Sequence, residues 1–302
     1  MGFTLQPRRD LAAEIRRAAA ERVDKAVGAI DNKPADEAVH EARKRLKQLR
    51  AIVRLIRGEI GKKAYGKENI FFRDAGRLIA AARDAAVLVE TLDNLTAQHR
   101  DDLAGGAFQA VRKQLVKRRD AERKRALGQG AEDGTEALAE VRRRLLAARE
   151  RIAGWPVKAE GFAAVAPGLK RVYARGREGL AEARQTPTTD ALHDWRKRAK
   201  YLRYHVELLE EVWPGMMSAL ADQLHELTDY LGDDHDLAVL ADTLTTEGKA
   251  LAEAGTRDTL LALIERRREA LQAAAMELGH RLYVETPADF VNRLGSYYNA
   301  AG

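Results

Sequence analysis

Apolar residues recur at three- and four-residue intervals along most of the chain, and strand-like alternation is hard to find. This spacing is typical of amphipathic helices. The chain is also rich in alanine, leucine, arginine and glutamate, which favour helix. The pattern therefore predicts an all-α protein, with helices over residues 10–30, 36–57, 67–98, 107–127, 135–153, 166–185, 189–212, 216–246, 256–278 and 287–298.

Prolines and glycines fall between these segments, as expected for joints. The strongest joint lies at 152–167 and contains Gly154, Pro156 and Gly161. It predicts one domain over residues 1–302, built from an N-terminal helical half (1–155) and a C-terminal helical half (156–302). Two helix starts also carry cap signals: a threonine (Thr188 or Thr189) after Pro187, and Thr286-Pro287.

One basic segment occurs twice. VHEARKRLKQLRAIVRLIR (39–57) resembles LHDWRKRAKYLRYHVELL (192–209), and the register that aligns His40 with His193 also matches the basic residues that follow. The repeat continues in ARDAAVLVETL (82–92) and DHDLAVLADTL (234–244), with an offset one residue different. The repeat predicts two related halves that present basic helices to one shared anionic ligand.

On a helical wheel of ~100° per residue, each basic segment has an apolar side and an adjacent basic side. The first basic face consists of His40, Arg43, Lys47, Arg50, Arg54 and Arg57, with Lys44 at its margin. The second basic face consists of His193, Arg196, Lys200 and Arg203, with Lys197 as the counterpart of Lys44. Glu207 stands where the first copy has Arg54, so the second face is shorter or is closed by an acid.

The net charge is only +6, from 52 Lys and Arg against 46 Asp and Glu, but the excess is concentrated in these segments. Like charges spaced three and four residues apart destabilise a helix by a few tenths of a kcal/mol per pair. Two interpretations follow: an anionic ligand completes the two faces, or acids on neighbouring helices pair with them. His40 and His193 either bind that ligand or cap and pack the first turn.

The chain has no cysteine, which excludes disulfides, cysteine nucleophiles and thiolate metal sites. No segment approaches ~20 apolar residues without charge, and the N-terminal segment lacks the apolar core of a secretory signal. A cytoplasmic protein without a membrane span is expected.

The residues resemble those of the CHAD family, the conserved histidine α-helical domain. The resemblance rests on HEARKRLKQLR after Val39, on LHDWRKRAKYLRYHVELLEEVWP from Leu192, on LGDDHDLAVL from Leu231 and on GLKRVYARGREGLAEA. It covers nearly the whole chain. It implies two four-helix bundles related by pseudo-two-fold symmetry, with basic helices lining a central groove.

The resemblance also implies binding of inorganic polyphosphate and association with polyphosphate granules. We expect this binding to involve no catalysis, cofactor or metal. By the same resemblance both basic faces, with Lys44 and Lys197, would line the groove, and Arg77 and Arg83 are candidate additions. No E-x-E-x-K signature of a triphosphate-tunnel domain is present, so a stand-alone member is expected. Polyphosphate has a charge at each phosphate and no bases, which suits lysine and arginine without stacking aromatics.

Two alternatives remain. The segment 233–236 (DDHD), with His193, His205 and His225, suggests a metal-dependent phosphohydrolase of the HD type, although the first half has Arg83-Asp84 in place of the His-Asp pair. A nucleic-acid binder is the other, but aromatic residues are 6% of the chain and none lies within a basic face. The further basic segments 112–125 and 142–144 spread around their helices, which favours a solvated surface over a granule- or membrane-facing role.

Overall fold

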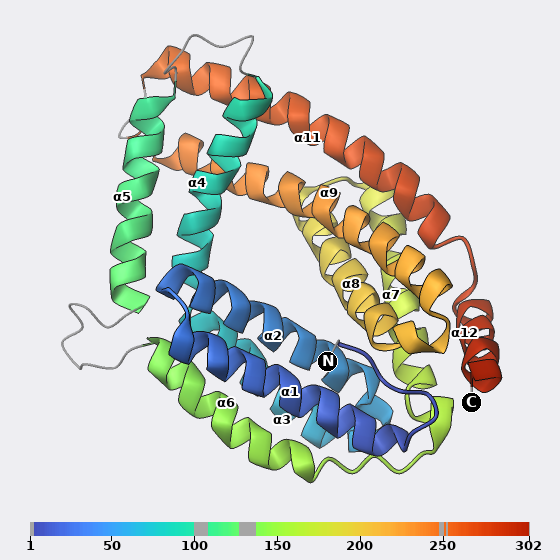
Figure 1. Cartoon of the computed structure of the whole chain (residues 1–302). Helices are drawn as coiled ribbons and strands as arrows, with labels where there is room; N and C mark the ends of the chain where they lie inside the picture. The colour runs from blue at the N-terminus through green and yellow to red at the C-terminus, as the bar shows by residue number, and fades with distance from the viewer. Residues whose placement is uncertain (1–2, 100–107, 127–136, 248–250, 252, 302) are drawn as a thin grey trace.

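The computed structural model describes residues 3–99, 108–126, 137–247, 251 and 253–301 (Figure 1). These residues form long helices joined by short connections, and no strand occurs in the described ranges. The helices are α1 Leu11–Asn32, α2 Ala35–Leu55, α3 Arg57–Leu78, α4 Ala80–Gln98, α5 Gln109–Ala126, α6 Ala137–Ala153, α7 Ala166–Gln185, α8 Thr189–Leu208, α9 Pro214–Thr246, α11 Ala254–Leu282 and α12 Pro287–Ala301, with short 3-10 turns η1 Gly161–Ala164 and η2 Glu210–Val212. The predicted all-α class is confirmed.

The prediction of a single helix over 67–98 is wrong, because two helices, α3 and α4, cover this part of the chain and the first of them begins ten residues earlier. The chain is already helical from Arg57, and α3 ends at Leu78. Ile79, at φ −113° and ψ 18°, separates α3 from α4 and is buried. Gly61 interrupts α3 with φ 75° and ψ 163°, a conformation that glycine adopts without steric penalty. The joint at Ile79 has neither proline nor glycine, so the sequence pattern does not reveal it.

Two groups of buried apolar residues hold the helices together. The larger includes Leu49 and Ile52 of α2, Trp195 and Leu202 of α8, and many residues of α1, α3, α6, α7 and α12. The smaller joins Leu92 of α4 and the helix α5 to the far parts of α9 and α11. In Figure 1 α9 and α11 accordingly run from the α7–α8 group to the α4–α5 pair.

Close helix contacts fix the two basic helices. A Cβ atom at Gly168 would lie 1.9 Å from the carbonyl oxygen of Leu55, so only glycine lets α7 approach the end of α2 this closely. A Cβ atom at Gly279 would lie 2.4 Å from the ring of Trp195, which is fully buried in α8. Thr188 caps α8 by accepting a hydrogen bond from the Ala191 amide at 3.2 Å, and Thr286 accepts one from the Asp289 amide at 3.2 Å, as the cap signals predicted.

Candidate anion-binding site

The two basic helices pack against each other. His205 of α8 is fully buried, and its Nε2–H donates a hydrogen bond to the carbonyl oxygen of Ala51 in α2 at 2.9 Å. Burial lowers the pKa of His205 to about 4, so the ring is neutral near pH 7. His205 therefore has a structural role at the point where α2 meets α8.

Lys47 of α2 and Lys200 of α8 lie in a strongly cationic environment. Burial, followed by the charges of Lys200 and Arg43, lowers the pKa of Lys47 to about 7. Burial and the charge of Arg196 likewise lower the pKa of Lys200 to about 8. Neither ammonium group has a hydrogen bond or ion pair to any described residue, although Asp229 and Asp236 are near enough to act on Lys200. The protonated form of each lysine thus lacks a close counter-charge.

The rest of the first basic face contacts amides, carbonyls and rings more than acids. Arg50 donates to the Asn69 side-chain oxygen at 3.2 Å, and Arg54 donates to the same oxygen at 2.7 Å. Arg54 also lies over the Tyr201 ring, 4.0 Å from its centroid. Arg43 is the exception, because it lies 3.5 Å from the Asp84 carboxylate while donating to the Gly76 carbonyl.

The two ends of the first basic face differ. His40 is exposed, and its pKa is lowered by partial burial and by the charge of Arg83. Lys44 is half-buried without a partner among the described residues. Arg57 lies over the Tyr65 ring at 4.4 Å.

The second basic face is partly neutralised. Arg203 is buried and donates a hydrogen bond to Glu207 at 2.7 Å. Glu207 therefore neutralises this end of the second basic face, which is one of the two possibilities that the sequence suggested. Lys197 forms an ion pair with Asp194. Arg196 keeps a buried Nε without a partner, in space left by Gly232, where a Cβ would lie 3.0 Å from the guanidinium.

Pairing with acids therefore explains only part of the two faces, namely Arg43, Lys197 and Arg203. The basic segments of α5 and α6 are different, because most of their arginines form ion pairs across the surface. These pairs include Arg112–Asp93, Arg118–Glu247, Arg123–Asp36, Arg142–Asp31, Arg143–Glu140 and Arg144–Glu140. The arginines of these two helices thus have close carboxylates, whereas several cations of the α2–α8 region do not.

The two candidate additions are both paired. Arg77 is exposed and lies 3.5 Å from Asp74. Arg83 forms an ion pair with Glu90 at 2.8 Å, yet its charge contributes to the lowered pKa values of His40 and Lys47. Arg83 is therefore near the first basic face, whereas Arg77 shows no such link.

The acidic segment of α9 is used for packing. Asp234 is buried and accepts hydrogen bonds from Arg268 at 3.0 Å and from Gln272 at 2.7 Å. His235 stacks on His193 with 4.0 Å between ring centroids. Within the described ranges no group of three or more His, Asp or Glu side chains is placed to hold a metal ion.

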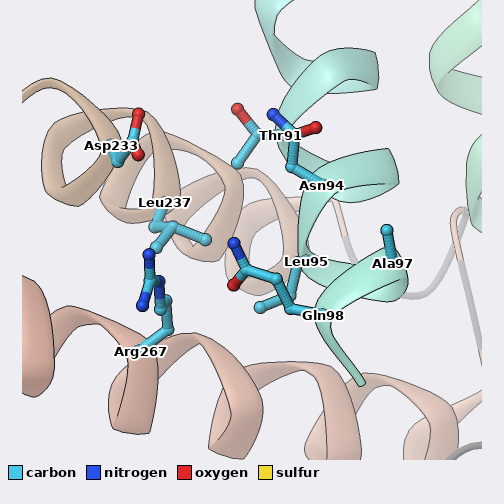
Figure 2. A pocket seen from close by; sticks show the side chains of 8 residues that line it. All are labelled: Thr91, Asn94, Leu95, Ala97, Gln98, Asp233, Leu237 and Arg267. Atoms are coloured by element: carbon cyan, nitrogen blue, oxygen red, sulfur yellow. The ribbon is translucent and has the colours of Figure 1, made fainter. Parts of the chain in front are cut away.

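A separate pocket of ≈ 340 Å³ lies between α4, α9 and α11 (Figure 2). Thr91, Asn94 and Gln98 line one side, and Asp233 and Arg267 line the other. The pKa of Asp233 is raised by burial and by Asp229. Because this pocket offers one carboxylate and one guanidinium, its charge is balanced, and it does not suit a polyanion.

Comparison with known proteins agrees with the resemblance in the sequence. A family model described as "CHAD domain" matches residues 8–245. A crystal structure of the CHAD domain from the plant Ricinus communis is similar to this chain, with a TM-score of 0.60 and 18% sequence identity over 93% of this chain and 95% of that chain. A search of curated proteins found no match. No helix in the described part of the chain is long and apolar enough to cross a membrane.

Proposed function

Because the chain belongs to the CHAD domain family, we propose that it binds inorganic polyphosphate between α2 and α8, without turnover of the bound chain. The observation that carries the proposal is the environment of Lys47 and Lys200. Two partly buried ammonium groups lie among arginines, and no carboxylate pairs with either. A phosphate chain would supply the missing counter-charge.

The chemistry of the ligand follows from the side chains around it. Arginine forks can hold two phosphate oxygens at once, and lysine supplies a compact charge. Arg54 and Arg57 lie over the rings of Tyr201 and Tyr65, so each of these tyrosines already has an arginine, not a base, against one side of its ring. These features favour a base-free polyanion over RNA or DNA. Cytoplasmic location and association with polyphosphate granules belong to the same proposal.

The proposal is tested by titrating the protein with polyphosphates of increasing length at several salt concentrations. Affinity should rise with chain length and fall steeply with salt, because binding releases counterions from the polyanion. Lys47→Met/Lys200→Met should weaken binding strongly without unfolding the protein, since it removes two partly buried charges that lack a close counter-charge. The matched control is Lys113→Met/Lys117→Met on α5, where both lysines are exposed.

Two results would contradict the proposal. Equal affinity for orthophosphate and for long chains would show that no extended site exists. RNA that displaces polyphosphate at equal phosphate concentration would identify nucleic acid as the better ligand.

A further inference from the structure

A second group of cations lies beyond the C-terminal end of the first basic face, where α2, α3, α7 and α8 meet. One pocket there is lined by Arg54, Arg57, Arg171, Arg175 and Arg198, with Tyr65 and Tyr201. One neighbouring pocket shares Arg171 and Arg175 with it and adds Lys170, and another shares Arg57 and Arg171 and adds Lys62. The sequence repeat does not reveal this group, because Arg171 and Arg175 lie outside both basic segments and Arg198 lies off the second basic face.

None of the five arginines forms an ion pair with a carboxylate in the described part of the chain. Arg171 and Arg175 are exposed and have no hydrogen bond to any described residue. The pKa of Arg198 is lowered by burial and by the charge of Arg175, which agrees with two cations that lie close together. Glu178, in an outer pocket, is the one acid among the residues that line these three pockets.

The other half of the molecule offers an internal comparison. The register that aligns His40 with His193 also aligns Arg45 with Arg198 and Arg22 with Arg175. The first-half arginines lie together too, because the charge of Arg45 contributes to the lowered pKa of Arg22, after burial.

In the first half, however, acids neutralise these positions. Arg45 donates to Glu41 at 2.6 Å. Arg22 is fully buried, beside Glu21 at 3.3 Å. At the position equivalent to Arg54, Glu207 holds Arg203.

For Arg198 the difference can be traced to one acid. Asp194 occupies the position equivalent to Glu41, but its carboxylate pairs with Lys197 and leaves Arg198 without a partner. One end of the α2–α8 region is thus closed by carboxylates, while the equivalent place at the other end keeps five unpaired arginines.

The open end is continuous with the proposed central site. Arg50 and Arg54 both donate to the side-chain oxygen of Asn69. Lys47 lies on the same face of α2, two turns before Arg54. At ~1.5 Å per residue, Lys47 and Arg54 are about 10 Å apart along α2. The contact between Gly168 and Leu55 brings the start of α7, and with it Arg171, next to this end of α2.

We propose that this arginine group is a second phosphate-binding site, and that polyphosphate extends from the Lys47–Lys200 centre in one direction only, onto Arg171, Arg175 and Arg198. The inference rests on the proposed function and adds a direction and a length requirement to it. Short chains occupy the centre alone, whereas chains long enough to reach α7 occupy both sites.

The test compares Arg171→Glu/Arg175→Glu with the wild type for tripolyphosphate and for long-chain polyphosphate. Both side chains are exposed and unpaired, so the fold should be retained, which circular dichroism checks. The variant should bind the long chain at least about tenfold more weakly at low salt. The slope of log affinity against log salt should become shallower by about one to two. Tripolyphosphate affinity should change little.

Two further variants sharpen the comparison. Arg171→Gln/Arg175→Gln should show a smaller loss in the same direction, since it removes charge without adding repulsion. Lys113→Glu/Lys117→Glu changes the net charge as much as the double Glu variant but lies on α5, and it should bind the long chain like the wild type.

The outcomes separate this inference from the proposed function. If the wild type binds long chains but both Glu variants bind them equally well or are weakened equally, the second site is refuted and the central site stands. If the wild type fails to bind long chains at all, the proposed function itself is refuted.

Discussion

The imidazole rings of His193 and His235 stack with 4.0 Å between their centroids and an interplanar angle of 30°. Burial, and then the charge of His193, lowers the pKa of His235 to about 4 from its usual 6.5. At neutral pH His235 is therefore uncharged, which lets it pack beside the cations of α8 without adding to their repulsion.

Acid should destabilise the protein partly through this pair. The unfolded chain takes up a proton on His235 near pH 6.5, before the folded protein does, so the free energy of unfolding should fall as the pH drops from about 6.5 to about 4. His235→Phe keeps a ring and removes the titration, so its unfolding free energy should vary less over this range. Urea denaturation at several pH values measures the difference. The exposed His280, changed to Gln, is the control, and equal pH dependence in His235→Phe and wild type would refute the interpretation.

Alkaline pH should stabilise the ligand-free protein. The pKa of Lys47 is lowered to about 7 by burial and by neighbouring cations, whereas the unfolded chain keeps the usual 10.5. Between these values the unfolded state holds more protons, so the free energy of unfolding rises with pH. Lys47→Met should be more stable than the wild type at pH 7 and should show a weaker rise, while the exposed Lys113→Met should keep the wild-type profile. Denaturant unfolding at several pH values between about 7 and 10.5 measures these free energies. The same pH dependence in Lys47→Met and Lys113→Met would contradict the prediction.

Gly168→Ala should destabilise the α2–α7 contact. The new methyl group would lie 1.9 Å from the Leu55 carbonyl oxygen, and backbone atoms must move to accommodate it. A loss of about 1–3 kcal/mol in unfolding free energy is expected, as for other overpacked sites. Gly28→Ala in α1 meets nothing within 4 Å and should instead stabilise the protein by about 0.5–1 kcal/mol. Thermal or chemical denaturation measures the change in unfolding free energy for both variants. Similar changes in the two would show that the contact between Gly168 and Leu55 does not require glycine.

Asp234→Asn should lower the stability of the fold, and it should not change phosphate release from polyphosphate. Asp234 is buried and holds both Arg268 and Gln272, so a neutral amide would weaken charge-assisted hydrogen bonds by about 1–3 kcal/mol. With divalent metal ions added, phosphate release from polyphosphate should stay at the protein-free background for wild type and variant. Metal-dependent release by the wild type that disappears in Asp234→Asn would instead support the hydrolase alternative.

The sequence predicts the helical class and the two basic faces because both depend on local spacing. The apolar period defines the buried side of each helix, and the repeat identifies equivalent basic positions. The joint at Ile79 was missed because a buried isoleucine that separates two helices looks like any core residue of one longer helix.

The environment of each charge could not be read from spacing. Glu41 and Asp194 occupy equivalent positions, yet one pairs with Arg45 and the other with Lys197. The ring of Tyr201 lies outside the second basic face on the wheel, but it contacts Arg54 of the neighbouring helix α2. Tyr65 lies in neither basic segment, and it contacts Arg57 across the break at Gly61 in α3. Such partnerships depend on tertiary packing, which also sets the burial that shifts the lysine pKa values.

The most direct test of the central claim is the pKa of Lys47 with and without polyphosphate. Lysines carrying ¹³C-methyl groups can be followed by NMR during a pH titration, and the Lys47 signal is identified by its absence from Lys47→Met. We expect the pKa of Lys47 to be about 7 in the free protein and to rise markedly when long-chain polyphosphate saturates it. A pKa that stays the same with the ligand fully bound would show that polyphosphate binds elsewhere.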